Sequence, residues 1–239
     1  MKSGFRAVLF DLDGTLADTL ADLANAVNHA LITLDCPTHL LSAYRYFVGD
    51  GARNLILRAL PSDKASLVDK GLALMRAHYY AHCFYKTRLY PGIPELVANL
   101  HKRGLKLAVF SNKPDVFTKR MVAHFFGGDC SREPARGDVS PPAASRLAAT
   151  VGPFDAVQGH EAPWPIKPDP TVALEIAKEL DVPVAEWIYL GDTNTDMWTA
   201  RAAGMFAVGA LWGFRDQEEL LGDGAQHLVA NPQELLHLL

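Results

Sequence analysis

The chain is patterned as short, continuous apolar runs that alternate with stretches of helical periodicity. The apolar runs lie at 7–10, 105–110, 154–157, 187–190, 206–211 and 227–229. Helical patterns stand between several of them, at 95–103, 115–126, 171–180 and 196–203. Strands that are apolar throughout and alternate with helices are typical of a parallel sheet covered on both faces. The pattern therefore predicts an α/β fold with a doubly wound, Rossmann-like parallel sheet.

Residues 17–88 follow a different pattern, because helical periodicity continues through them and no strand is recognisable. The first helix is marked by apolar residues at helical spacing: Leu20, Leu23, Val27, Leu31 and Leu34. Further helical patterns lie at 40–47, 52–60 and 63–85. We expect an all-α helical cap at 17–88, inserted into a core of residues 1–16 and 89–239. Two connections would join it to the core, which is the arrangement of a lid over a site.

One stretch of the core fits neither pattern. Residues 127–153, "GGDCSREPARGDVSPPAASRLAATVGP", are rich in Gly, Pro, Ser, Ala and Arg and show little periodicity. They predict an irregular loop insertion, with a short helix at 143–150. The loop joins a helix to the next strand, so we expect it at the amino-terminal edge of the sheet. Ligands of such sheets bind at the opposite edge, which predicts that the insertion lies far from the chemistry.

Composition then narrows the class of protein. The chain has 239 residues, of which 49% are hydrophobic and 21% charged, and its formal net charge is -4. These values are those of a soluble globular protein and disfavour nucleic acid as a partner. The three cysteines are odd in number and form no CxxC pattern, which favours a reducing compartment. The first apolar run is too short for a signal peptide and no run reaches about 18 residues, so we expect a cytoplasmic protein without a membrane partner.

Polar residues that suit catalysis follow the predicted strands. The first group is in "AVLFDLDGTLADT" at 7–19, where Asp11 ends an apolar strand and Asp13 follows in a turn begun by Gly14. Two neighbouring carboxylates resist joint ionisation unless a cation lies between them or one remains protonated. The pair therefore suits either a hard divalent metal or a nucleophile beside a general acid/base. Taken alone, the same residues also suit a solvated turn.

Three further stretches follow other predicted strands or precede helices. "VFSNKP" at 109–114 places Ser111 and Asn112 at a helix start, where a hydroxyl and free amides form an anion cradle or simply cap the helix. "IKPDP" at 166–170 places Lys167 before a helix, against the helix dipole. "IYLGDTNTD" at 188–196 ends a strand in Asp192 and puts Asp196 in the next helical turn.

Each of these residues has its own structural explanation, but those explanations do not account for their occurrence together at one place. In a parallel sheet the carboxyl ends of the strands meet at one edge, so Asp11, Ser111 and Asp192 should emerge together, with Lys167 in a nearby loop. Carboxylates, a hydroxyl and a cation in one crevice fit the joint binding of an oxyanion and a hard cation beside an in-line nucleophile.

At these positions the sequence resembles the haloacid dehalogenase-like hydrolase superfamily. "DLDGTLADT" matches its first motif, Ser111 its second, Lys167 its third and "GDTNTD" its fourth, in the right order. The helical insertion after the first motif is similar to the small cap of one branch. Within that branch, "VGDGARNLI" at 48–56 and "YYAHCFYKTRLYPGIPELVANL" at 79–100 resemble phosphoglycolate phosphatase-like enzymes. The insertion at 127–153 departs from the family.

The resemblance implies a role for each matched residue. Asp11 would attack phosphorus and become an aspartyl-phosphate, and Asp13 would serve as general acid and then general base. Mg²⁺ would be held by the Asp11 carboxylate, the backbone carbonyl of Asp13 and Asp192. Phosphoryl oxygens would be bound by Ser111 and the Asn112 amide, with Lys167 neutralising charge. Asp196 would orient metal-bound water or Lys167.

Two further residues need an interpretation: Arg53, which lies outside the motifs, and Asp18, which lies within the first. In related enzymes the neighbourhood of Arg53 faces the substrate, so Arg53 is a candidate partner for a substrate carboxylate, although an exposed cap arginine explains it as well. Asp18 does not belong with Asp11 and Asp13, and we expect it to cap the first helix of the cap.

The predicted function is a Mg²⁺-dependent phosphatase for a small anionic phosphate monoester, phosphoglycolate-like, acting as a monomer or homodimer. Asp13 favours phosphoryl transfer, because an alkoxide leaving group needs a proton and branch members that cleave carbon–halogen or carbon–phosphorus bonds lack an aspartate there. A phosphosugar mutase, similar to β-phosphoglucomutase, carries the same residues and remains an alternative. A non-catalytic binding protein on the same fold is the third hypothesis.

Overall fold

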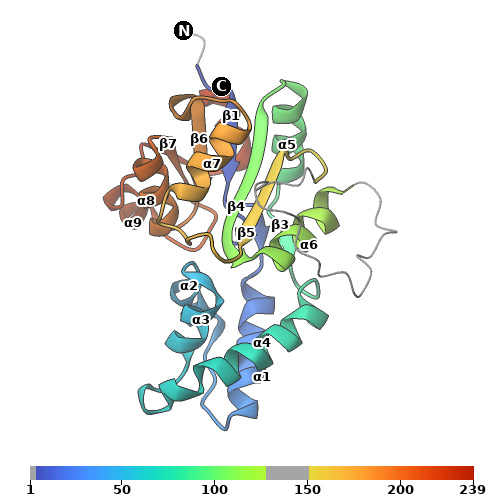
Figure 1. Cartoon of the computed structure of the whole chain (residues 1–239), viewed down its shortest axis with the longest axis vertical. Helices are drawn as coiled ribbons and strands as arrows, with labels where there is room; N and C mark the ends of the chain where they lie inside the picture. The colour runs from blue at the N-terminus through green and yellow to red at the C-terminus, as the bar shows by residue number, and fades with distance from the viewer. Residues whose placement is uncertain (1–3, 128–150) are drawn as a thin grey trace.

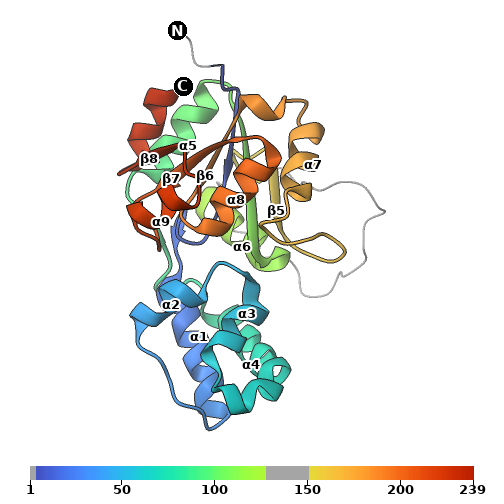
Figure 2. The ribbon, with the colours of Figure 1, turned by 90° about the vertical axis from the view of Figure 1, so that its left-hand side faces the viewer.

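The computed structural model describes residues 4–127 and 151–239 and contains a six-stranded parallel sheet with a helical unit beside it (Figures 1 and 2). Of the predicted insertion at 127–153, only its first residue and its last three are described, so the predictions for the rest of it, including the short helix, lie outside the described residues. Among the described residues, no helix has both the length and the apolar character needed to cross a membrane.

The sheet has the strand order β5-β4-β1-β6-β7-β8, with every neighbouring pair parallel. Its strands are β1 (Ala7–Phe10), β4 (Lys106–Pro114), β5 (Ala156–His160), β6 (Trp187–Gly191), β7 (Phe206–Ala210) and β8 (His227–Val229). Each lies at or overlaps a predicted apolar run. Because β1 is central and flanked by β4 and β6, the chain builds outward in both directions from it, which confirms the predicted doubly wound α/β fold.

Helices cover both faces of the sheet and bury its alternating side chains. In β1, Val8 and Phe10 face one apolar cluster and Ala7 and Leu9 face the other, all fully buried. The first cluster includes α5 (Ile93–Lys102) and α6 (Asp115–Phe126), and the second includes α7 (Thr171–Glu179) and α8 (Asn194–Ala203). The remaining short elements are η2 (Val184–Glu186), α9 (Gln217–Gly222) and η3 (Pro232–Leu238). A strand buried on both faces explains the continuous apolar runs.

The helical unit, residues 17–88, lies at the carboxyl ends of the strands (Figure 1). It contains α1 (Leu20–Thr33), α2 (Leu41–Phe47), α3 (Gly51–Ala59), η1 (Ser62–Leu67) and α4 (Val68–His82). The chain enters through β2 (Ala17–Asp18) and leaves through β3 (Arg88–Leu89), which pair antiparallel. The expectation that no strand occurs here was wrong for these two short strands, and the predicted helix at 63–85 is shorter, since its first turn is the 3₁₀ element η1.

The junction between the sheet and the helical unit is held by a buried carboxylate. Asp22 of α1 is only 3% exposed and accepts hydrogen bonds from the Lys86 amide, at 2.9 and 3.1 Å to its two oxygens. It also accepts from the amide and hydroxyl of Thr87, each at 2.8 Å. These bonds tie α1 to the segment that returns to the core, so the two connections are fixed side by side.

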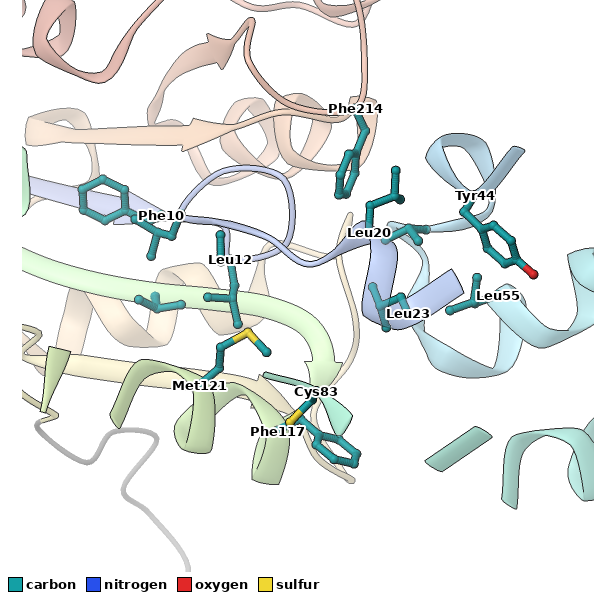
Figure 3. Close-up of a cluster of buried hydrophobic side chains, with 14 of the residues drawn as sticks. Phe10, Leu12, Leu20, Leu23, Tyr44, Leu55, Cys83, Phe117, Met121 and Phe214 are labelled. Carbon is teal, nitrogen blue, oxygen red and sulfur yellow. The ribbon is translucent and has the colours of Figure 1, made fainter. Parts of the chain in front are cut away.

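Apolar packing continues across the same junction. Figure 3 shows Phe10 on β1, Leu12 just after it, Phe117 and Met121 on α6, and side chains of the helical unit in a single cluster. The labelled side chains from the helical unit are Leu20, Leu23, Tyr44, Leu55 and Cys83. Asp18, expected as the cap of the first helix, is exposed and accepts a hydrogen bond from the Leu20 amide at 3.3 Å, while Thr19 occupies the capping position of α1 itself.

Candidate active site

Three neighbouring strands deliver the polar residues to one edge of the sheet. Asp11 follows β1, Asp192 follows β6, and Ser111 lies in the last part of β4, where the regular register with β5 is lost after Phe110. The Asp11 amide donates a hydrogen bond to the Leu190 carbonyl at 2.9 Å, which continues the β1–β6 pairing into the site. The carboxyl ends of parallel strands therefore place Asp11, Ser111 and Asp192 together, as the sequence predicts.

Lys167 lies at the centre of the buried charges. Its ammonium contacts Asp11 Oδ1 at 2.7 Å and Asp196 Oδ1 at 2.6 Å, and all three side chains are at most 8% exposed. Burial alone would lower the pKa of Lys167, but the carboxylates of Asp11 and Asp196 outweigh it and hold the pKa well above its usual range. The lysine is therefore charged and bridges two carboxylates that would otherwise repel each other.

Asp196 has both oxygens occupied by donors. Its Oδ2 accepts from the Thr193 amide at 3.1 Å and the Thr193 hydroxyl at 2.7 Å, a capping box at the start of α8. Its Oδ1 accepts from Lys167 and from the Tyr189 hydroxyl, the latter at 3.4 Å. The carboxylate thus begins the helix and orients Lys167, which is one of the two partners that the resemblance implied for it.

Asp192 completes a group of three buried carboxylates, because ligand oxygens of Asp11, Asp192 and Asp196 all lie within 4.8 Å of one another. Its own oxygens accept from the Thr15 hydroxyl at 2.9 Å and the Phe214 amide at 2.8 Å. Burial, and then the charge of Asp11, raise the pKa of Asp192 well above its usual value. Burial likewise raises the pKa of Asp11 to about 7, although Lys167 opposes the shift.

The donor set fits a hard divalent cation. Within the described part of the chain three buried carboxylates share one lysine, so their full ionisation would leave negative charge that a bound cation would balance. Oxygen ligands are those that Mg²⁺ prefers, and the carboxylates of Asp11 and Asp192 are the best placed, since Asp196 is saturated by Lys167, Thr193 and Tyr189. Asp13 contributes no side-chain oxygen to this group, which is compatible with the predicted use of its backbone carbonyl.

Two glycines leave room for Asp192. Gly14 has φ +92°, and a Cβ there would lie 2.2 Å from Asp192 Oδ2. A Cβ at Gly213 would lie 2.2 Å from the Cβ of Asp192. Gly14 therefore explains why a glycine follows Asp13 in the first motif, since the turn needs a left-handed residue and the carboxylate needs the space. Gly213 was not identified from the sequence, because only the fold brings it beside Asp192.

We expect Gly14→Ala to lower kcat/KM of the reaction at this site by at least about 100-fold, because the new methyl group displaces the carboxylate of Asp192. Gly104 is the matched control: it also has a positive φ, +79°, but a Cβ there would meet nothing within 4 Å. Both variants carry the strain of a left-handed alanine, about 1 kcal/mol. Steady-state kinetics and urea unfolding of the two separate strain from displacement. Equal activity of the two variants would contradict the close approach described above.

Asp13 is held by Lys113, a residue for which the sequence predicts no role. Lys113 Nζ donates to both oxygens of Asp13, at 2.9 and 3.1 Å, and lies 4.7 Å from the centre of the Tyr79 ring. Burial would lower the pKa of Lys113, but the carboxylate of Asp13 outweighs it and raises the pKa above its ordinary value. The signal in the sequence is a lysine that directly continues an apolar strand, where a solvated residue is not expected.

Ser111 and Asn112 lie beside these charges. The Ser111 hydroxyl is buried and accepts from the Lys113 amide at 3.3 Å. The Asn112 side chain accepts from the Lys167 amide at 2.7 Å and donates to the Lys167 carbonyl at 3.1 Å, so it fixes the backbone that carries the lysine. It also donates to the Gly49 carbonyl at 2.9 Å, which links the sheet to the helical unit.

A cleft of about 590 Å³, open to solvent, lies between the sheet edge and the helical unit. The sheet side contributes Asp11, Asp13, Ser111, Asn112 and Lys113, and the helical unit contributes mostly apolar side chains. The predicted substrate ligand Arg53 is not among the lining residues. It is exposed and forms an ion pair with Asp69 on α4, whereas Arg76, also on α4, does line the cleft.

Comparison with known proteins agrees with these features. The sequence pattern of haloacid dehalogenase-like hydrolases matches residues 5–204. Proteins named phosphoglycolate phosphatase from Pseudomonas syringae pv. tomato and Pseudomonas putida are 32% and 33% identical to this chain, each over 97% of it and 78% of their own length.

Solved structures give the same result for the fold. A Lactobacillus delbrueckii protein assigned as a phosphoglycolate phosphatase superposes with a TM-score of 0.82 at 28% identity, covering 97% of this chain and 96% of its own. A haloacid dehalogenase-like family protein from Streptococcus pneumoniae superposes with a TM-score of 0.78 at 22% identity over 98% of both chains, which shows the shared fold. With the family match spanning most of the sequence, this chain belongs to the haloacid dehalogenase-like hydrolases.

Proposed function

We propose that the protein is a Mg²⁺-dependent phosphatase that hydrolyses a small anionic phosphate monoester through an aspartyl-phosphate on Asp11. The observation that carries the proposal is the position of Asp11. Its carboxylate lines the cleft, is paired with Lys167 at 2.7 Å and belongs to the buried carboxylate group with Asp192. A nucleophile beside a fixed positive charge and a metal-binding oxygen set is what phosphoryl transfer requires.

In the first step, an Asp11 oxygen attacks phosphorus and the bond between phosphorus and the ester oxygen breaks. The leaving oxygen takes a proton from Asp13, which lines the same cleft. In the second step, Asp13 removes a proton from water as the water attacks the phosphorus of the aspartyl-phosphate. Inorganic phosphate leaves and Asp11 is regenerated. Asp13 has donated one proton to the leaving group and regained one from water, so it ends in its starting protonation state.

Charge on the phosphoryl group is met by this chain's own donors. Lys167 is already held against Asp11 by Asp196, and the Asn112 side chain fixes its backbone. The Ser111 hydroxyl and the backbone amide of Asn112 supply hydrogen bonds to phosphoryl oxygens. Asp11, Asp192 and the Asp13 carbonyl would hold Mg²⁺, whose charge would neutralise the buried carboxylates and the phosphoryl oxygens.

We propose further that residues 17–88 act as a cap domain over a core of 1–16 and 89–239. The paired connections β2 and β3, the Asp22 anchor and the apolar helical wall of the cleft support this role. A cap of this kind excludes water from the phosphorylated enzyme until the leaving group departs.

Phosphoglycolate is the first substrate to test, since relatives covering 97% of this chain carry that name. A phosphate-release assay over small esters, with and without Mg²⁺, should show highest kcat/KM on a carboxylated ester. A phosphosugar mutase would instead form sugar bisphosphates without releasing phosphate. Absence of phosphate release from the whole panel in Mg²⁺ would overturn the proposal.

Metal binding can be tested without any substrate. A cation that binds only the native site stabilises it, by about 2.7 kcal/mol at a concentration 100 times its dissociation constant. We therefore expect Mg²⁺ to raise the melting temperature of the wild type by several degrees over an EDTA control.

Asp192→Asn should lose most of this increase, because it removes a charged oxygen ligand. Asp63→Asn should keep it, since Asp63 is exposed on η1, outside the carboxylate group. An equal increase in the two variants would argue against Asp192 as a ligand.

A further inference from the structure

Two polar side chains of α4 line the cleft and leave hydrogen-bonding capacity unused among the described residues. Arg76 is exposed and, among the described residues, forms no hydrogen bond or ion pair. Tyr79 lies three positions further on, and residues three apart share one face of a helix. The face of α4 turned to the cleft, which also carries Met75, thus presents a guanidinium and a phenol to whatever enters.

The Tyr79 hydroxyl is the more unusual of the two. The side chain is only 2% exposed, and its oxygen makes no hydrogen bond of ordinary geometry within the described part of the chain. The nearby Lys113 ammonium can only donate to this oxygen, so the hydroxyl proton has no acceptor among the described residues. The ring is nevertheless fixed, with its centre 5.2 Å from that of Phe117 and Lys113 over its face at 4.7 Å. A buried hydroxyl whose proton has no acceptor costs free energy, so such a group in the wall of a cleft points to a ligand that accepts this proton.

The charged residues that line the cleft are not all paired with an opposite charge among the described residues. Of the charged residues that line it, Asp13 is paired with Lys113 and Asp11 is paired with Lys167, which leaves Arg76 without a counter-charge among the described residues. The other cleft residues of the helical unit are glycine or apolar apart from Tyr79, so they offer an anion no competing partner.

We propose that Arg76 and Tyr79 form a subsite that binds a carboxylate on the leaving group of the substrate ester. This inference rests on the proposed phosphatase function and names the residues that select the substrate class. The guanidinium donates two parallel hydrogen bonds to the carboxylate and the Tyr79 hydroxyl donates a third. Arg53, the cap arginine suggested by the sequence, is neutralised by Asp69 outside the cleft and takes no part.

The test compares two esters that differ only in this charge: phosphoglycolate, and 2-hydroxyethyl phosphate, in which a neutral hydroxymethyl group replaces the carboxylate. In Arg76→Ala, the ratio of kcat/KM for phosphoglycolate over that for 2-hydroxyethyl phosphate should fall about 10- to 100-fold, chiefly through KM. Lys70→Ala is the matched control, because it removes one positive charge from the exposed surface of the same helix, away from the cleft. Its ratio should change less than about twofold.

Tyr79→Phe tests the hydroxyl alone. The same ratio should fall about 3- to 10-fold, while the melting temperature of the free protein should change little, since the hydroxyl proton has no acceptor to lose there. A ratio unchanged in Arg76→Ala, or equal losses on both esters, would overturn the subsite.

Direct binding keeps this inference separate from the proposed function. Calorimetric titration of phosphoglycolate into Asp11→Asn protein, with and without Arg76→Ala, should show weaker binding in the double variant by about 10-fold or more. That result supports the subsite even if the wild type hydrolyses no ester. An unchanged dissociation constant overturns it even if the protein proves to be a phosphatase.

Discussion

Asp11→Asn should reduce kcat for phosphate release by at least about 10⁴-fold, because the amide cannot replace the carboxylate as nucleophile. The fold should survive, since the substitution keeps the shape of the side chain and removes one negative charge from a crowded, buried group. Phosphate release from phosphoglycolate in excess Mg²⁺ measures the first expectation. Circular dichroism and thermal melting measure the second.

Asp18→Asn provides the matched control for Asp11→Asn. Asp18 lies in the same motif but is exposed, and among the described residues its carboxylate accepts a single hydrogen bond, from the Leu20 amide at 3.3 Å. The same chemical change there should leave kcat within about twofold and cost little stability. A well-folded Asp11→Asn protein that retains a tenth of wild-type kcat would rule out the nucleophile assignment.

Lys167→Met should remove activity and also destabilise the fold. The substitution leaves Asp11 and Asp196 buried with their shared counter-charge gone, and breaking a buried ion pair in this way typically costs about 3–5 kcal/mol. Chemical denaturation in metal-free buffer measures the free energy of unfolding. Lys178→Met is the surface control, because its exposed ion pair with Glu175 should contribute less than about 1 kcal/mol.

The cost of Lys167→Met should depend on pH. In the folded wild type the pKa of Asp11 is raised to about 7, above the value of about 4 expected when unfolded, so the folded state binds more protons between these limits and its stability falls as pH rises through them. Without the lysine the folded pKa rises further, and the stability difference from wild type should widen from pH 5 to pH 8. A difference that shrinks with rising pH would contradict the central position of Lys167.

The sheet could be predicted because its strands are buried on both faces. A run that is apolar throughout, as at β1, has few interpretations once helices of the right length separate it from the next run. Even the bounds of α6, 115–126, follow from periodicity alone. The two-residue strands β2 and β3 could not be found in this way, since a pair of residues carries no period and their pairing joins segments about 70 positions apart.

The residues of the site that follow strands could be predicted for the same reason. Parallel topology brings Asp11, Ser111 and Asp192 to one edge whatever the details of packing. Residues whose position depends on how α4 packs against the sheet could not be predicted, which is why Tyr79 and Arg76 were missed. Lys113 was missed although it continues the apolar strand β4, because its partner Asp13 follows another strand. Arg53 was proposed from its neighbourhood along the chain, but its partner Asp69 belongs to another helix.

The central claim is that phosphoryl transfer proceeds in two displacements, with Asp11 as the first acceptor. The stereochemical course at phosphorus tests this most directly. The substrate is the phosphorothioate analogue of phosphoglycolate, made chiral at phosphorus with oxygen isotopes, and it is hydrolysed in isotopically labelled water. Two in-line displacements, each with inversion, predict net retention of configuration. Net inversion would mean that water attacks the substrate directly, and it would contradict an aspartyl-phosphate on Asp11.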